Sequence, residues 1–344
     1  MSKWADLPGD VFFQIVCRLF SDDIIISSAV CKSWHSLLNS VGKLPLPPSC
    51  PWLMLAEENE QSEKSNNEES RTRGFFNLRN DKLHHFKLPE VAGRRCFGAS
   101  FGWLLTIGTD LQINLLHLFS KYLLCLPPIA TFRCQYEFKV TPERLRRMFL
   151  KKSPWNPATQ ECDCDCVIMV IYGEYQQLAF TRPGYKSWTD IKSSRRRRYA
   201  DIAFYKGKFY ALDYDGALVV CRIDDNKMPR AKAIAPPLEG ITMSFKWNVQ
   251  KYIVESSGGL LLVYSLGDQA LFVGDNSSLS LTASSLNGVK PNCIHFTDDD
   301  LRVFNCTRND GGSDMGVFSM EDAEIKSHYS GQSLSFFCAP LWYI

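Results

Sequence analysis

The sequence of 344 residues predicts an α+β multidomain protein, with a small helical unit at the N-terminus and a larger all-β part after it. Three observations support this prediction. Apolar residues in the first 44 positions recur at the three- and four-residue spacing of helices. Four prolines then fall between Lys43 and Pro51. From Trp52 onward, short apolar or alternating runs are separated by Gly, Asp, Asn and Pro, as in antiparallel strands.

Composition limits the classes of function. Lysine and arginine number 39 against 37 acidic residues, so the formal charge is only +2, which argues against a nucleic-acid partner. No stretch of about 18 uncharged apolar residues is present, so we expect no signal peptide and no membrane partner. The 13 cysteines are irregularly spaced, and we expect free thiols in a protein of the cytosol, the nucleus or both. The sequence predicts no cofactor.

Three short helices are expected before residue 44. The first opens at Pro8, because the missing N–H of proline suits the first turn of a helix. The second follows Ser21–Asp23, which reads as an N-cap with acidic residues in the first turn. The third contains the apolar repeat between Ala29 and Leu38, and it ends near Gly42 and Pro45. Because so small a bundle cannot bury all its apolar side chains, the surplus face packs either on the rest of the chain or on a partner.

Two short stretches favour a partner: the pair Leu7-Pro8, and the segment from Val30 to Trp34. Together with their surroundings, from residue 4 to about 42, they resemble an F-box. The resemblance implies a unit at residues 1–44 that docks on a Skp-type adaptor and, through it, joins a cullin-RING ubiquitin ligase. The implied contact or supporting residues are Leu7, Pro8, Val11, Ile15, Leu19, Ile24, Val30, Cys31 and Trp34.

A domain boundary is expected in the proline-rich segment 45–51, which should form a stiff, extended linker. The β part then covers residues 52–344, beginning with a buried strand at Trp52–Leu55. Residues 57–73 contain six glutamates and no apolar side chain. This composition predicts a disordered acidic loop.

The β part is expected to be a β-propeller, with a pair of sandwiches as the alternative. One hairpin is clear, because Phe209–Leu212 and Ala217–Cys221 flank a turn that contains Asp215-Gly216. Blades of about 40 to 45 residues, fitted into residues 52–344, give six or seven blades.

Several phrases of the β part resemble the kelch-related propeller of plant F-box proteins, the KIB group, formerly a domain of unknown function. They lie at residues 93–104, 123–128, 178–184, 205–211, 265–274, 292–299 and 340–342. The resemblance implies an F-box-associated propeller that captures a protein substrate for ubiquitination. It carries over no catalytic residue.

The sequence departs from that family at one place. Family members usually have a further strand pair where Val263-Tyr264 here runs directly into Ser265-Leu266. We hypothesise that about half a blade is absent, leaving either a gap with exposed strand edges or a smaller closed ring.

Four other motifs are better explained without special chemistry. Gly98–Gly102 fits the G-x-S-x-G pattern of hydrolases, but a strand rather than a helix is expected after it. Cys162–Cys166 alternates thiols, which makes a poor zinc cage, and a strand at Val167–Tyr172 should follow. The basic run Arg195–Arg198 is a candidate import signal, but charge runs are usually solvated turns. The basic segment Glu143–Lys152 should be a short helix or strand edge at the surface.

These observations predict the non-catalytic substrate-recognition subunit of a Skp-cullin-F-box ubiquitin ligase. The alternative is a binding or scaffold protein whose incomplete propeller no longer supports ubiquitination. A propeller hydrolase would need acids, histidines or a nucleophile gathered at the central channel, and the sequence shows no such set.

Overall fold

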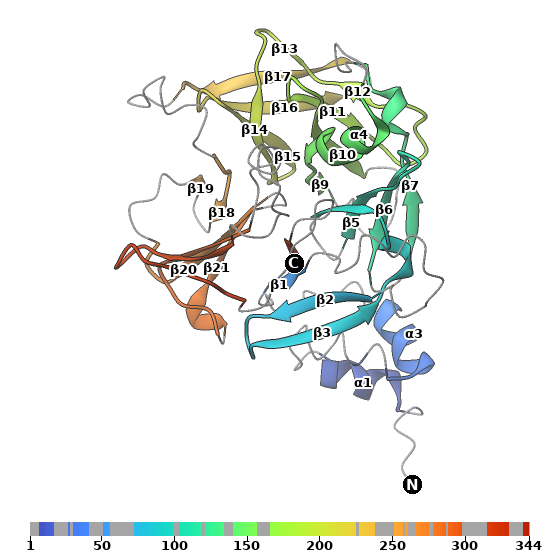
Figure 1. Ribbon diagram of the computed structural model, residues 1–344, viewed down its shortest axis with the longest axis vertical. Coiled ribbons are helices and arrows are strands. Elements are labelled where there is room, and N and C mark those ends of the chain that lie inside the picture. The colour runs from blue at the N-terminus through green and yellow to red at the C-terminus, as the bar shows by residue number, and fades with distance from the viewer. Residues whose placement is uncertain are drawn as a thin grey trace.

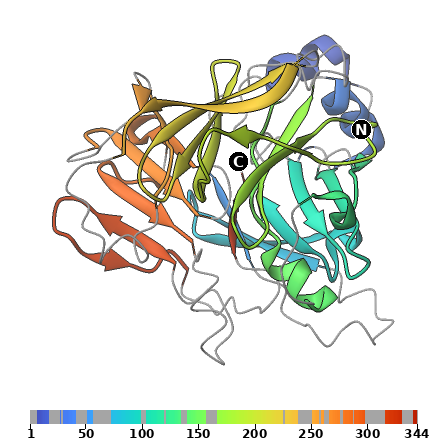
Figure 2. The same ribbon diagram turned by 90° about the horizontal axis from the view of Figure 1, so that it is seen from above.

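In the computed structural model of the protein, five β-sheets are arranged in a ring, which is the architecture of a five-bladed β-propeller (Figure 1 and Figure 2). The structure describes residues 7–16, 27, 30–40, 51–55, 72–98, 103–118, 121–133, 140–156, 166–224, 227–237, 251–256, 259–260, 266–274, 278–286, 288–297, 315–329 and 340–343. Helices α1 (Gly9–Val16) and α3 (Lys32–Ser40) lie outside the ring in both views.

The first sheet closes the ring. Its strands, in order, are β25 (Leu341–Tyr343), β1 (Trp52–Met54), β2 (Thr72–Asn77) and β3 (Lys82–Lys87). β25 pairs antiparallel with β1, with Leu53 opposite Trp342. The two ends of the propeller sequence are therefore held in one sheet.

The second and third sheets follow in chain order. The second contains β4 (Arg95–Gly98), β5 (Trp103–Ile107), β6 (Ile113–His117) and β7 (Leu123–Cys125). The third runs β12 (Thr189–Asp190), β11 (Gln177–Thr181), β10 (Val167–Tyr172) and β8 (Leu150–Lys152), with β9 (Trp155–Asn156) also paired to β10. Helix α4 (Pro142–Met148) precedes β8, and the hydroxyl of Thr141 accepts a hydrogen bond from the Arg144 N–H at its start.

The fourth sheet contains the hairpin that the sequence predicts. Its order is β13 (Lys192–Ser193), β17 (Lys227–Ala235), β16 (Leu218–Asp224), β15 (Lys208–Asp213) and β14 (Tyr199–Tyr205). Gly216, in the turn between β15 and β16, has a φ of 87°, the left-handed conformation that favours glycine.

The fifth sheet has seven strands, more than any other. Its order is β19 (Gly259–Leu260), β18 (Glu255–Ser256), β21 (Leu279–Thr282), β20 (Gln269–Val273), β22 (Cys293–Phe296), β23 (Gly316–Ser319) and β24 (Ile325–Lys326). The short β18–β19 hairpin joins the rest through a parallel pairing of Glu255 with Leu279. Three single-turn 3₁₀ helices complete the described elements: η4 (Pro89–Val91), η5 (Ile129–Thr131) and η8 (Ala283–Ser285).

Buried apolar clusters join neighbouring sheets. Met54 and Leu104 pack between the first and second sheets, and Leu105 and Val170 pack between the second and third. Ile171 and Val219 pack between the third and fourth sheets. Leu53 and Phe272 pack between the fifth and first sheets. β10 is buried along its whole length, because its alternate side chains enter the clusters on either side of the third sheet.

The junction of the fourth and fifth sheets is different. Among the described residues, no buried apolar cluster spans this junction. Instead, Lys152 of the third sheet and Asp201 of the fourth meet there, next to polar groups of Ile253 and Ser278. Lys152 Nζ lies 2.5 Å from Asp201 Oδ1, and both side chains are almost fully buried. The other Asp201 oxygen accepts the backbone N–H of Ile253 at 2.6 Å, and Lys152 donates to the Ser278 hydroxyl at 3.3 Å.

The structure corrects the expected blade count. The described residues form five sheets, so the estimate of six or seven blades is wrong, and so is the alternative of two sandwiches. The estimate failed because it divided the chain evenly. The strands of the fifth sheet come from residues 255–326, and many residues of the sequence lie between strands.

Two local expectations are also corrected. The predicted acidic loop 57–73 ends too late, because Thr72 and Arg73 belong to β2, where Arg73 is buried and donates to the carbonyl of Leu55. The basic segment 143–152 is not wholly at the surface. Arg146 is buried and donates to the carbonyl of Gly93 at 2.8 Å, while Lys152 pairs with Asp201.

Candidate functional site

The two N-terminal helices pack on each other through one aromatic pair. The ring centroids of Phe12, on α1, and Trp34, on α3, lie 4.8 Å apart, and Phe12 is fully buried. Gly9 permits this approach, since a Cβ there would lie only 3.3 Å from Leu37. At the start of α3 the Trp34 N–H donates to the sulfur of Cys31 at 3.5 Å. Cys31 therefore has a structural role in the described helices.

Several of the residues expected to bind an adaptor are exposed. Val11 is 42% exposed and Val30 is 58% exposed, both high for valine, and Pro8 is also exposed. Leu7, Ile15, Cys31 and Trp34 are half-buried. The described helices thus present apolar side chains that the helix pair itself does not cover.

The remaining expected positions are not placed. Leu19 and Ile24 lie outside the described residues, and so does most of the predicted second helix, of which only Ser27 is described. Likewise, the predicted boundary and linker at residues 45–51 fall almost entirely outside the described part and stay a prediction.

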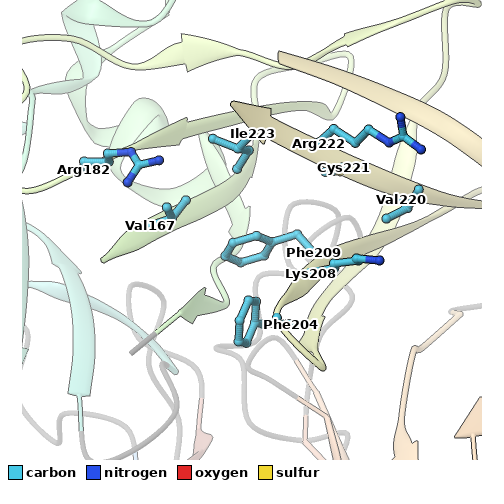
Figure 3. A pocket seen from close by; sticks show the side chains of 10 residues that line it. Val167, Arg182, Phe204, Lys208, Phe209, Val220, Cys221, Arg222 and Ile223 are labelled. Atoms are coloured by element: carbon cyan, nitrogen blue, oxygen red, sulfur yellow. The ribbon is translucent and has the colours of Figure 1, made fainter. Parts of the chain in front are cut away.

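A second candidate site is a pocket of about 450 Å³ between the third and fourth sheets, within the size range of ligand-binding pockets. Its lining residues come from the ends of β10, β11, β14, β15 and β16: Val167, Arg182, Phe204, Gly207, Lys208, Phe209, Val220, Cys221, Arg222 and Ile223. Figure 3 shows the rings of Phe204 and Phe209 at the centre, with Arg182 on one side and Arg222 and Lys208 on the other.

The pocket has an apolar floor. The rings of Phe204 and Phe209 are 4.9 Å apart, and Phe209 is buried. None of the lining residues is a carboxylate. Two of the lining cations, Lys208 and Arg222, are exposed, and because side chains alternate along a strand they project from the face of the fourth sheet opposite to that of Phe209 and Cys221 (Figure 3). The one nucleophile in the lining, the Cys221 thiol, is buried, which raises its pKa to about 12. This thiol is therefore held in its neutral form near pH 7.

The turn that supplies Lys208 is fixed by its glycine. Lys206 and Gly207 connect β14 to β15 with φ angles of 45° and 77°, as in the two-residue turns that match the twist of a hairpin. This turn sets Phe204 opposite Phe209 and therefore places both rings at the pocket.

The hydrolase-like segment Gly98–Gly102 and the cysteine run Cys162–Cys166 are each followed by a strand, as the sequence predicts. Strand β5, not a helix, follows the G-x-S-x-G segment, of which residues 99–102 lie outside the described residues. Cys166 is buried just before β10, while Cys162 and Cys164 lie outside the described residues. The described cysteines, Cys31, Cys96, Cys125, Cys166, Cys221 and Cys293, are all free thiols.

The described residues contain neither a candidate metal site nor a membrane-spanning helix. No group of three or more His, Cys, Asp or Glu side chains there could hold a metal ion. No helix in the described part is long and apolar enough to span a membrane.

The basic run Arg195–Arg198 precedes β14, and two of its residues are engaged on the fourth sheet. Arg197 forms an ion pair with Asp213, and the guanidinium of Arg198 lies 5.8 Å from the ring of Tyr214. Arg195 and Arg196 are exposed, as expected for a solvated turn.

Sequence reasoning did not identify the pocket. Arg182 follows β11, while Lys208 lies in β15 and Arg222 in β16, so no linear spacing marks these residues. The only local signal was the Lys206-Gly207 turn, which predicts a hairpin but not what its ends enclose.

Comparison with known families assigns both parts of the chain. The F-box domain family matches residues 4–45. The KIB1-4 beta-propeller family matches residues 75–265 and 262–319, in two pieces that overlap at residues 262–265.

Individual relatives agree with this assignment. The putative F-box protein At5g55150 of Arabidopsis thaliana is 25% identical, with 99% of this chain and 96% of the relative aligned. F-box protein KIB4 of the same plant is 22% identical over 87% of this chain and 84% of its own length. F-box/kelch-repeat protein At3g18720 is 27% identical over 62% of this chain and 53% of its own length. The chain is therefore an F-box protein of the KIB1-4 β-propeller family.

Proposed function

We propose that this protein is the substrate-recognition subunit of a Skp-cullin-F-box ubiquitin ligase. An N-terminal three-helix F-box binds the Skp-type adaptor, and the propeller binds a protein substrate. The observation that carries the proposal is the exposure of Val11 and Val30 within a segment that matches the F-box family. An apolar surface of this kind, left open by its own helices, suits a stable protein partner.

In this proposal the chain performs no chemistry. The adaptor and cullin hold the propeller beside a charged ubiquitin carrier, so the lysines of a bound substrate are kept at a high effective concentration near the reactive thioester. The chain contributes two binding surfaces and the rigid ring that separates them. The propeller's described sheets supply that rigidity through apolar clusters at four of their junctions.

Co-purification with a Skp-type adaptor and cullin tests the proposal. Wild-type chain should retain both, while a variant carrying Leu7→Ala, Pro8→Ala and Trp34→Ala should lose both, because truncating interface anchors costs about 2 kcal/mol or more each. Ile325→Ala serves as the matched control, since Ile325 is 67% exposed but lies on the propeller.

Circular dichroism must accompany the capture, because Trp34 also packs on Phe12. Loss of adaptor from a triple variant whose propeller still melts cooperatively supports the proposal. Absence of adaptor from the wild-type sample contradicts it.

A second candidate is a non-catalytic binding or scaffold protein with an incomplete propeller. It is favoured by the split family match at 262–265 and by the attachment of the β18–β19 hairpin to an already complete sheet. The alignment with At5g55150 spans 384 positions against 344 residues in this chain, so that relative contains segments with no counterpart here.

Ubiquitin transfer separates the two candidates. In a reconstituted cullin-RING reaction, a receptor should place ubiquitin on its own lysines or on a bound client. A scaffold should bind the adaptor and show no transfer to either. A sharp, two-state thermal melt of the purified chain would count against a damaged propeller.

A further inference from the structure

We infer that the face of the fourth sheet opposite to its contact with the third sheet binds a run of acidic residues in a protein substrate. The inference deepens the proposed function and rests on it for the identity of the partner as a protein substrate. Strand register and side-chain exposure define this binding surface.

The two faces of the fourth sheet differ in chemistry. On one face Phe209 and Cys221, directly opposite each other on β15 and β16, belong to the buried cluster shared with the third sheet. Lys208 and Arg222 are the chain neighbours of this pair. Because side chains alternate along a strand, both project from the other face, and Figure 3 shows them directed away from the ring of Phe209.

A row of four cations crosses that other face. Arg222, on β16, lies directly opposite Arg230 on β17, and Arg230 is paired in turn with Lys192 on β13. Lys208, on β15, extends the row on the other side of Arg222, because β15 and β16 are in register at the adjacent position. All four side chains are exposed. We call these four residues the cationic row.

The described residues do not balance this charge. None of the four cations forms an ion pair with a carboxylate in the described part of the chain. The next acid along β16, Asp224, follows an irregularity in the register and is paired with Lys227, outside the row. Like charges directly opposite each other on neighbouring strands repel. Carboxylates bound along the row would replace this repulsion with attraction.

Half-buried aromatic and aliphatic side chains border the row. Tyr205, on β14, lies opposite Lys208 at one end of the row. Tyr210 and Val220 are opposite each other in the next row of the same face, and the rings of the two tyrosines are 6.4 Å apart. An extended peptide along the cationic row would therefore set its carboxylates on the cations and its methylene groups against the tyrosines.

The dimensions of the row indicate the length of the partner segment. Neighbouring strands lie about 4.8 Å apart, so four cations on four adjacent strands span about 14 Å, the reach of about five extended residues. The formal charge of the whole chain is only +2, far below the excess that nucleic-acid binders carry. We therefore assign the row to a short acidic segment of a protein rather than to a phosphate backbone.

The probe is a fluorescein-labelled peptide, Gly-Gly-Glu-Glu-Glu-Glu-Glu-Gly-Gly, titrated with the full-length chain at low ionic strength and followed by anisotropy. A comparison peptide replaces every glutamate by glutamine, and a labelled single-stranded oligothymidylate carries the same net charge as the acidic peptide. We expect the acidic peptide to bind at least about tenfold more tightly than the glutamine peptide, equivalent to about 1.4 kcal/mol. Added salt should weaken its binding, because the cations are exposed.

Charge-neutralising variants locate the binding. Arg222→Gln combined with Arg230→Gln should reduce affinity for the acidic peptide about tenfold or more, and should not lower the melting temperature, because a repulsive pair is removed. Lys82→Gln combined with Lys87→Gln is the matched control. It removes the same net charge from two exposed positions of β3 in the first sheet, and it should leave affinity unchanged.

A second variant pair guards against a local change in the sheet. Lys192→Gln combined with Lys208→Gln neutralises the two ends of the cationic row and leaves both arginines in place, and it should also weaken binding of the acidic peptide. The thermal melt of each variant checks that the propeller remains folded.

Binding of the acidic peptide that weakens in both row variants, but not in the β3 control, supports the inference. Equal affinity for the acidic and glutamine peptides, or an equal loss in the β3 control, overturns it. Tighter binding of the oligothymidylate than of the acidic peptide also overturns it, because the row would then suit a phosphate backbone. Adaptor capture, measured separately, tells failure of this surface from failure of the proposed function.

Discussion

A buried histidine pair illustrates what single residues contribute to this fold. His295, on β22, stacks on Phe272 with ring centroids 4.5 Å apart and faces His328 at 5.7 Å. Both ring nitrogens of His295 are buried without a hydrogen-bond partner among the described residues. Burial, assisted by His328, lowers the pKa of His295 to about 3, so it acts as a neutral aromatic spacer.

The fold should therefore lose stability in mild acid. Below about pH 6.5 the unfolded chain protonates His295 while the folded chain does not, so the free energy of unfolding falls as pH drops from 6.5 toward 3. This residue alone contributes a slope of about 1.4 kcal/mol per pH unit. Urea denaturation at pH 7 and pH 5 should show a smaller pH difference for His295→Phe than for wild type. Identical differences would show that His295 is not buried as described.

The pocket between the third and fourth sheets could not be predicted from single residues. Its two phenylalanines are ordinary residues in a strand-rich sequence, and only the register of Phe204 opposite Phe209 and the neighbouring third sheet bring them together. The candidate adaptor residues, among them Val11 and Val30, could be listed from the sequence because the F-box stretch is contiguous, but which of them are exposed could not be predicted from their spacing.

At the scale of elements, strands were predicted well where one pattern governs them. The apolar run Val167–Tyr172 and the Asp-Gly hairpin before Leu218 are strands as expected. By contrast, the burial of Lys152 could not be predicted from the sequence. Its partner Asp201 lies 49 positions away and belongs to the neighbouring fourth sheet. Local sequence made that segment look like solvent-exposed charge.

Lys152 and Asp201 should be essential to the junction of the third, fourth and fifth sheets. Asp201→Asn leaves Lys152 as a buried, uncompensated charge, and Lys152→Met does the same to Asp201. Each should lower the free energy of unfolding by about 3–5 kcal/mol.

The double variant should recover part of this loss, since neither charge then remains unpaired. Lys326→Met, which removes an exposed partner of Glu324, is the control and should change stability by less than about 0.5 kcal/mol. Chemical denaturation of all four variants measures the effects. Additive losses in the double variant would refute the coupling.

At the scale of the whole molecule, the sequence identified a propeller but not its blade number. Blade count depends on how the chain closes, and here closure places β25 beside β1 and attaches a short hairpin to the fifth sheet. Neither pairing is local, so spacing arithmetic could not predict them. The family assignment was accessible because the matching phrases are distributed along nearly the whole β part.

Calorimetric titration of the purified chain with a purified Skp-type adaptor tests most directly whether the F-box segment binds that adaptor. Val11→Asp and Val30→Asp place a charge on the exposed apolar side chains without touching the Phe12–Trp34 contact. Lys326→Asp on the propeller serves as the control.

We expect wild type and Lys326→Asp to bind the adaptor tightly, and each valine variant to bind it about tenfold or more weakly with an unchanged melting temperature. Failure of the wild-type chain to bind the adaptor, or equal affinity in all four proteins, would contradict it.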